Sequence, residues 1–220
     1  MVELIRGLRA DQVRANLDRV REEIAAVGRD PSDVQILAAV KYVPVEELDA
    51  LAEAGIELVG ENRAQDLVAK AEAYPGLFTW DFIGQLQSRK VRQVLPYVRY
   101  IETVASESAM DQLGRHGTPA TEVLIEVNVA GEAGKSGIAP SELRSYLERS
   151  PVRVVGLMTM PPLAPTPEAS RGHFAALREL ATEHGLAELS MGTSQDYLIA
   201  VQEGATIVRL GTSLYRSGAS

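Results

Sequence analysis

The stretch QILAAVKYVPVEEL, residues 35–48, decides the fold. Its first part is an apolar run that ends in a single lysine, Lys41, and Pro44 then leads into a helix-like segment, 45–54. A continuously apolar strand followed by a turn and a helix is typical of parallel sheets, whose strands are buried on both faces. The stretch therefore predicts a β-α unit with a basic side chain at the carboxyl end of its strand.

The same unit recurs along the chain. We predict eight strands, at 35–41, 56–59, 79–83, 98–101, 122–128, 152–157, 187–190 and 206–210. Helical segments separate them, at 45–54, 63–73, 87–96, 106–114, 140–149, 168–185 and 195–203. Such alternation predicts an α/β fold that closes most economically into a (β/α)₈ TIM-type barrel. The alternative is an open doubly wound sheet, because no full helix follows the eighth strand.

An amphipathic helix is expected before the first unit, within residues 11–30, where Val13, Leu17, Val20 and Ile24 recur at helical spacing. A coiled coil would need more heptads than this segment offers. No change in composition marks a linker, so we expect residues 1–220 to form a single domain with this helix outside the repeat.

Composition narrows the class of protein. The net charge of −8 argues against general binding of nucleic acid or of an anionic membrane. There is no cysteine, no apolar run long enough to span a bilayer and no apolar signal-peptide segment in MVELIRGLRADQ, residues 1–12. We therefore expect a cytoplasmic protein. His116, His173 and His184 match no common metal-ligand spacing, and no metal site is expected.

Two polar residues follow the first two strands. Lys41 has two interpretations: a lysine whose stem lies along apolar surface with its amine in water, or a partly desolvated amine that attacks a carbonyl. Asn62, in VGENRAQD at residues 59–66, offers either a neutral amide to a ligand or a helix N-cap. Each residue alone leaves both alternatives open.

The loops after strands 7 and 8 carry the strongest signal. SMGTSQD at 190–196 and VRLGTS at 208–213 each combine a glycine with hydroxyl residues directly after a strand. Backbone N–H groups and hydroxyls at these two loops commonly form the phosphate site of a barrel. With Lys41 on strand 1 and Arg209 facing the ring nitrogen, the pattern predicts a site for pyridoxal 5'-phosphate. GKS at 134–136 is not a P-loop, because Val129 stands where that motif requires glycine.

Several long motifs, in order, resemble the pyridoxal phosphate homeostasis (YggS/PROSC) family. They are AAVKYVPVEEL (38–48), VGENRAQDLVAKAE (59–72), WDFIGQLQSRK (80–90), IEVNVAGEAGKSGI (125–138), GLMTMPP (156–162) and LSMGTSQDYLIAVQEGATIVRLGTSLY (189–215). The resemblance implies an alanine racemase-like barrel that holds the cofactor as a Schiff base on Lys41. It also implies phosphate against Ser194, Gly211 and Thr212, with Met191, Gly192, Asn62 and Arg209 around the cofactor.

The sequence departs from the family pattern at three positions. Val40 stands where members commonly have serine, Asp81 where they often have histidine, and Arg89 where they often have asparagine. These departures remove neither the lysine nor the phosphate loops, but they leave the chemistry of the rim open.

The resemblance implies a non-enzymatic role in intracellular cofactor homeostasis: binding, buffering and delivering pyridoxal phosphate, with effects on amino-acid and keto-acid balance. It implies a monomer, with pyridoxal phosphate-dependent apoenzymes as transient acceptors. The main alternative is an amino-acid racemase on the same barrel. Racemases carry a further β domain after the barrel, whereas here only residues 211–220 follow strand 8, so we expect a carrier.

Overall fold

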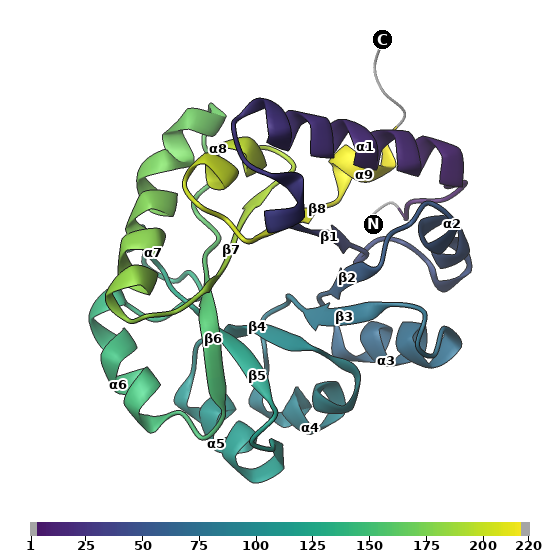
Figure 1. Ribbon diagram of the computed structural model, residues 1–220. Coiled ribbons are helices and arrows are strands. Elements are labelled where there is room, and N and C mark those ends of the chain that lie inside the picture. Colours follow the sequence, from purple (N-terminus) through teal and green to yellow (C-terminus); the bar gives the residue numbers. More distant parts are fainter. Residues whose placement is uncertain (1–3, 217–220) are drawn as a thin grey trace.

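The computed structural model describes residues 4–216, which form a closed barrel of eight parallel strands in chain order (Figure 1). The barrel closes between β8 and β1, where Ala38 pairs with Leu210. The strands are β1 (Gln35–Ala39), β2 (Leu58–Glu61), β3 (Thr79–Phe82), β4 (Tyr100–Val104), β5 (Glu122–Glu126), β6 (Arg153–Met158), β7 (Glu188–Thr193) and β8 (Ile207–Leu210). The predicted (β/α)₈ barrel is confirmed, and the open sheet is wrong.

Helices surround the ring of strands (Figure 1). They are α1 (Ala10–Ala26), α2 (Leu48–Glu53), α3 (Ala64–Ala73), α4 (Val91–Val94), α5 (Glu107–His116), α6 (Leu143–Arg149), α7 (Arg171–Glu183), α8 (Tyr197–Gln202) and α9 (Thr212–Tyr215). Short 3₁₀ turns extend several of them, at Val45–Glu47, Ser88–Lys90, Leu95–Tyr97, Pro140–Glu142 and Pro167–Ser170, and another, Pro31–Asp33, precedes β1.

The amino-terminal helix α1 packs outside the barrel beside α9 (Figure 1). Its predicted apolar face is buried: Val13, Leu17, Val20 and Ile24 are each at most 3% exposed. The buried Asn16 amide donates to the carbonyls of Leu214 and Arg216, both at 2.9 Å. The first helix thus holds the turn that follows the last strand.

The strand β1 is shorter than predicted, because it ends at Ala39 and Lys41 lies in the turn that follows. Two interactions turn the chain here: Val43 N donates to Val40 O at 2.9 Å, and Ile5 N donates to Tyr42 O at 2.8 Å. The strand β4 also starts later than predicted, at Tyr100, and continues to Val104. Apolar runs mark these strands but not their ends.

The inside of the barrel is only partly apolar. Leu37, Tyr100, Leu124, Met158 and Ile207 form one buried cluster there, separate from the larger core beneath the helices. Strands β3, β4, β5, β7 and β8 add buried polar side chains at the same alternation, namely Asp81, Glu102, Glu126, Ser190 and Arg209. Charged groups fully inside a barrel require partners, and these groups are taken up below.

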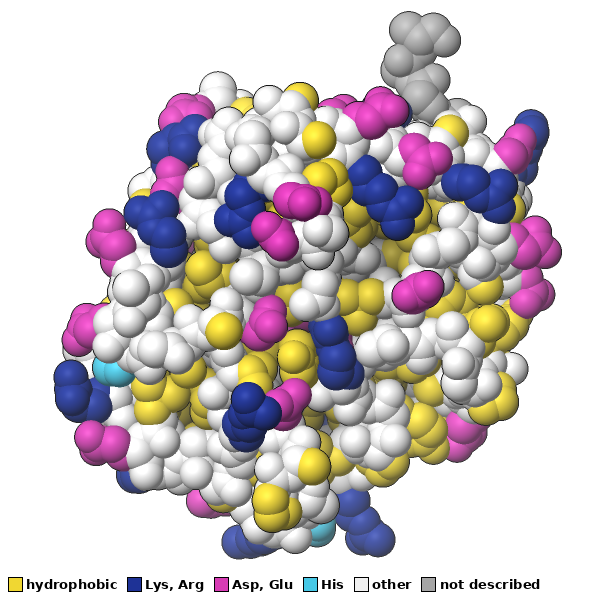
Figure 2. Space-filling view, viewed as in Figure 1, with side chains coloured by type: hydrophobic (Ala, Val, Ile, Leu, Met, Phe, Trp, Pro, Cys, Tyr) yellow, Lys and Arg dark blue, Asp and Glu magenta, His cyan; other side chains and the backbone are white. Residues whose placement is uncertain are grey.

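The surface carries charges of both signs, interspersed over the face seen in Figure 2. Among the helices in residues 4–216, none combines the length and the apolar character needed to cross a membrane. Within the same residues, no three His, Cys, Asp or Glu side chains gather as a metal site.

Candidate functional site

The loops after β7 and β8 meet at the carboxyl end of the barrel. Ser194 Oγ accepts hydrogen bonds from Gly211 N and Ser213 N, both at 3.2 Å, and Thr212 begins α9 with its side chain exposed. A hydroxyl oxygen therefore already sits where two backbone amides converge. Convergent amides of this kind favour an anionic oxygen. The structure brings together the predicted residues Ser194, Gly211 and Thr212.

Gly192 allows the β7 loop to pack tightly on α8. Its φ of +90° is in the region that favours glycine, and a Cβ there would lie 2.6 Å from Ala200 Cβ and 2.9 Å from Tyr197 Cα. Met191 is fully buried in the core beneath the helices, so its side chain faces away from the barrel interior. Only the backbone of Met191 can therefore line the carboxyl end of the barrel.

Arg209 lies inside the barrel below these loops, with its side chain 5% exposed. Nη1 donates to Ser190 Oγ at 2.5 Å, and Nη2 donates to the Thr159 carbonyl at 2.8 Å. Nη2 also contacts the sulfur of Met160 at 3.1 Å. The guanidinium is therefore a fixed cation at the base of the site.

Lys41 occupies the rim. Its side chain is exposed, and its Nζ lies 4.9 Å from the centre of the Tyr42 ring. Within residues 4–216 it makes no ion pair. The backbone brings the turn at Lys41 and the loop after β8 together, because a Cβ on Gly211 would stand 3.9 Å from Ala39 O, two residues before Lys41. The closed barrel thus makes β8 and β1 neighbours, and the two strands pair directly.

A buried ion pair braces the strand end before Lys41. Lys70 on α3 is 4% exposed, and its Nζ donates to Glu61 Oε2 at 2.5 Å and to Val40 O at 2.7 Å. Glu61 Oε1 in turn accepts from Asn62 N at 2.6 Å. One lysine thereby connects the ends of β1 and β2. The sequence predicts neither Glu61 nor Lys70 as a site residue, because their contact depends on how α3 folds back over the strands.

Asn62 is not the helix cap that the sequence left open. The N-cap position of α3 is Arg63, and no side chain caps this helix. The Asn62 Oδ1 atom is buried and has no hydrogen-bond partner among the described residues. Gly84 packs on the Asn62 backbone so closely that a Cβ would lie 2.0 Å from Asn62 O. The Asn62 backbone is thus fixed in position, and its side-chain oxygen Oδ1 can accept a hydrogen bond from a ligand.

The three departures from the family pattern lie in different places. Val40 is fully buried, and Asp81 is inside the barrel in an ion pair with Arg99. Arg89 is exposed and donates to Gln87 Oε1 at 3.1 and 3.2 Å. Of the three, only Arg89 lies on the exposed rim.

The donor set fits pyridoxal phosphate. Converging amides and the Ser194 hydroxyl suit its phosphate, Arg209 offers a cation, Lys41 an amine, and Asn62 an unused buried acceptor. Such convergent polar groups at the carboxyl ends of barrel strands are characteristic of binding sites in this fold.

Known proteins are similar to this chain in fold and in sequence, although no family model matches the chain. The Pyridoxal phosphate homeostasis protein of Aquifex aeolicus is 38% identical over 213 residues, covering 90% of this chain and 93% of that protein. The PipY structure from Synechococcus elongatus with bound pyridoxal phosphate has a TM-score of 0.80 at 30% identity, covering 93% of this chain and 100% of that one. Alanine racemase of Clostridium difficile shares the fold alone, with a TM-score of 0.71 at 14% identity over 97% of this chain and 58% of its own. The chain belongs to the pyridoxal phosphate homeostasis protein family.

Proposed function

We propose that the protein binds pyridoxal 5'-phosphate at the carboxyl end of the barrel, as a cofactor carrier in cytoplasmic pyridoxal phosphate homeostasis. The single observation that supports this most is the convergence of the Gly211 and Ser213 amides on Ser194 Oγ, in the loop that follows Arg209 at the end of β8. Relatives named for pyridoxal phosphate homeostasis, and PipY with this cofactor bound, supply the ligand.

Each residue of the site has a proposed task. The Gly211 and Ser213 amides exchange the Ser194 hydroxyl for a phosphate oxygen, and the Arg209 guanidinium faces the ring nitrogen. Asn62 Oδ1 accepts a hydrogen bond from the ligand. Lys41 Nζ is the tether: when bound, the cofactor supplies an aldehyde that condenses with this amine to a Schiff base, with loss of water.

Catalytic turnover is not part of the proposal, because Tyr197 and Tyr215 are engaged elsewhere. Racemisation requires a second acid–base group opposite the lysine. The Tyr197 hydroxyl donates to Glu23, and the Tyr215 hydroxyl donates to Ala39 O at 3.3 Å. Burial raises the pKa of Tyr215 far above its ordinary value, which suits a held donor and not a proton shuttle. We propose a monomer that gives up its cofactor to apoenzymes.

The test is to identify the lysine that carries the cofactor. The protein is mixed with pyridoxal phosphate, reduced with borohydride, digested and analysed by mass spectrometry. The lysines of the chain are Lys41, Lys70, Lys90 and Lys135. We expect the adduct on Lys41, because Lys70 is buried in an ion pair.

Two variants sharpen this test. Lys41→Ala should lose the visible absorbance of the bound aldehyde, whereas Lys135→Ala should keep it, since Lys135 is exposed and pairs with Glu132. An adduct distributed over exposed lysines, or colour retained in Lys41→Ala, would refute the tether. Steady racemisation of alanine by the loaded protein would refute the carrier role.

A further inference from the structure

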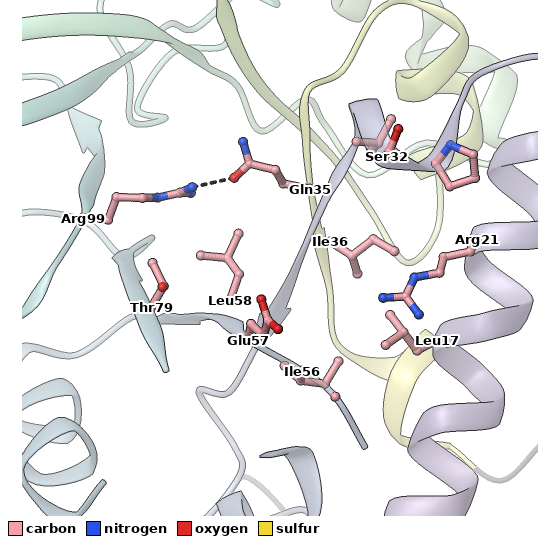
Figure 3. A pocket seen from close by; sticks show the side chains of 13 residues that line it. Leu17, Arg21, Ser32, Gln35, Ile36, Ile56, Glu57, Leu58, Thr79 and Arg99 are labelled. Atoms are coloured by element: carbon pink, nitrogen blue, oxygen red, sulfur yellow. Dashed lines mark hydrogen bonds between the residues drawn. The ribbon is translucent and has the colours of Figure 1, made fainter. Parts of the chain in front are cut away.

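Five polar side chains, one of them at the amino-terminal mouth, form a connected group through the barrel. This interior polar cluster consists of Asp81, Arg99, Glu102, Ser190 and Arg209. At the amino-terminal mouth Arg99 donates to Gln35 Oε1 (Figure 3). At the other end Arg209 donates to the Thr159 carbonyl, beneath the proposed cofactor site. The cluster therefore connects the two ends of the barrel.

The two carboxyl groups of the cluster have unequal surroundings. Asp81 accepts from Arg99 Nε at 3.1 Å, from Arg99 Nη2 at 2.5 Å and from Tyr100 N at 3.1 Å. These donors, two of them cationic, stabilise an ionised carboxylate. Burial raises the pKa of Asp81 and these donors oppose the rise, so Asp81 is the better stabilised anion of the pair.

Glu102 has fewer hydrogen-bond partners than Asp81. It is fully buried, its Oε2 accepts only from Ser190 Oγ at 2.6 Å, and its Oε1 has no partner among the described residues. Arg209 Nη1 stands 3.8 Å from Oε2, bound instead to Ser190 Oγ. An ionised carboxylate so placed would leave one oxygen unsatisfied and a cation unused nearby.

A proton on Oε1 resolves this arrangement. Asp81 and Glu102 are both buried carboxyl groups, so a proton on Glu102 removes the repulsion between two negative charges in the barrel interior. Burial, and next the charge of Asp81, raise the pKa of Glu102 to about 8. The charged groups that face Glu102 are Asp81 on β3 and Arg209 on β8, and those that face Arg209 are Glu102, Glu126 and Asp196.

We propose that Glu102 is a neutral carboxylic acid that positions Arg209 through Ser190, and that its deprotonation draws the guanidinium away from the cofactor. The identity of the ligand rests on the proposed function, whereas the protonation of Glu102 does not. On loss of the proton, the Glu102 side chain becomes a carboxylate, and its Oε2 attracts Arg209 Nη1, which lies 3.8 Å away. Arg209 then forms an ion pair with Glu102 inside the barrel, and the hydrogen bond from Arg209 to the ring nitrogen of the cofactor is weakened.

The binding test uses pyridoxine 5'-phosphate, which has the ring nitrogen and the phosphate but no aldehyde to react with Lys41. Its Kd is measured by calorimetry at about pH 7 and about pH 9, for the natural protein, Glu102→Gln and Glu126→Gln. The ligand's own titration is common to all three proteins. We expect the natural protein to weaken about tenfold more than Glu102→Gln, through loss of one charge-assisted hydrogen bond.

Glu126→Gln is the matched control, since it also removes a buried carboxyl but one that accepts from Ser136 at 2.7 Å. Its Kd should rise with pH as much as the Kd of the natural protein does. An equal rise of Kd in the natural protein and in Glu102→Gln would overturn the proposal, as would the absence of the rise in Glu126→Gln.

A second measurement needs no ligand. Glu102 is neutral in the fold and ionised in the unfolded chain, so unfolding between about pH 5 and pH 8 releases one proton more than unfolding of Glu102→Gln. The urea midpoint of the natural protein should therefore fall with rising pH relative to the variant. Equal proton release overturns the proposal whether or not the ligand binds.

The two measurements separate the two claims. If proton release differs as expected but none of the three proteins binds the ligand, the proposed function is refuted. The repositioning of Arg209 toward the cofactor is then refuted as well, whereas the protonation of Glu102 is still supported. If Glu102→Gln does not fold, the infrared carbonyl stretch of a buried carboxylic acid decides, measured in Glu126→Gln. It should be present at about pH 7 and disappear by about pH 9.5, and its absence at the lower pH overturns the proposal.

Discussion

Replacing Lys70 with methionine tests how the strand end before Lys41 is held. The substitution keeps the aliphatic stem and removes the ammonium that bonds Glu61 Oε2 and the Val40 carbonyl. Glu61 is fully buried, so the variant leaves an uncompensated charge in the interior. Removing one partner of such a pair costs about 3–5 kcal/mol of the free energy of unfolding.

Urea unfolding measures this change, followed by the fluorescence of the buried Trp80, the only tryptophan of the chain. Lys135→Met, at an exposed pair with Glu132, is the matched control and should change stability by less than about 1 kcal/mol. The double variant Glu61→Gln/Lys70→Met removes the orphan charge and should be more stable than Lys70→Met alone. Stability of Lys70→Met within about 1 kcal/mol of the natural protein would refute the reasoning.

Two further predictions concern the phosphate loops. Gly192→Ala places a methyl 2.6 Å from Ala200 Cβ at a φ of +90°, so we expect a loss of about 2–4 kcal/mol, whereas Gly131→Ala, with a φ of +67° and open space, should lose about 1 kcal/mol. Equal losses in urea unfolding would show that the close approach to α8 is unimportant. Asn16→Ala removes the two hydrogen bonds to the carbonyls of Leu214 and Arg216 and should lower stability by about 1–3 kcal/mol and weaken pyridoxal phosphate binding. Unchanged affinity in calorimetry would show that the turn holds its shape without α1.

The sequence predicts the barrel well because each strand is an apolar run and each is followed by a helical segment. Lys41 shows where this prediction ends. The apolar pattern predicts a strand that includes Lys41, but the strand stops at Ala39, since the turn depends on bonds from Val43 and Ile5. Such bonds come from distant or non-periodic residues and leave no mark in an apolar pattern.

The site is predicted in part for a related reason. Ser194, Gly211 and Arg209 carry local signals, a glycine and hydroxyls after a strand or a cation at its end, and the structure brings them together at one end of the barrel. Glu102 carries no such signal, and Ser190, within SMGTSQD, carries none that points to a partner across the barrel. They meet across the barrel at 2.6 Å because the stagger of the strands aligns β4 with β7, which no single segment determines.

The grip of Asn16 on the Leu214 and Arg216 carbonyls spans 198 and 200 positions in the chain, respectively. Contacts of such long range form late, because the cost of closing the loop comes before any gain. During synthesis, Asn16 of the amino-terminal helix therefore finds these partners only after the 198 and 200 positions that separate them have been added to the chain. A nascent chain has no finished phosphate loop, so the protein competes for cofactor only after its barrel has closed.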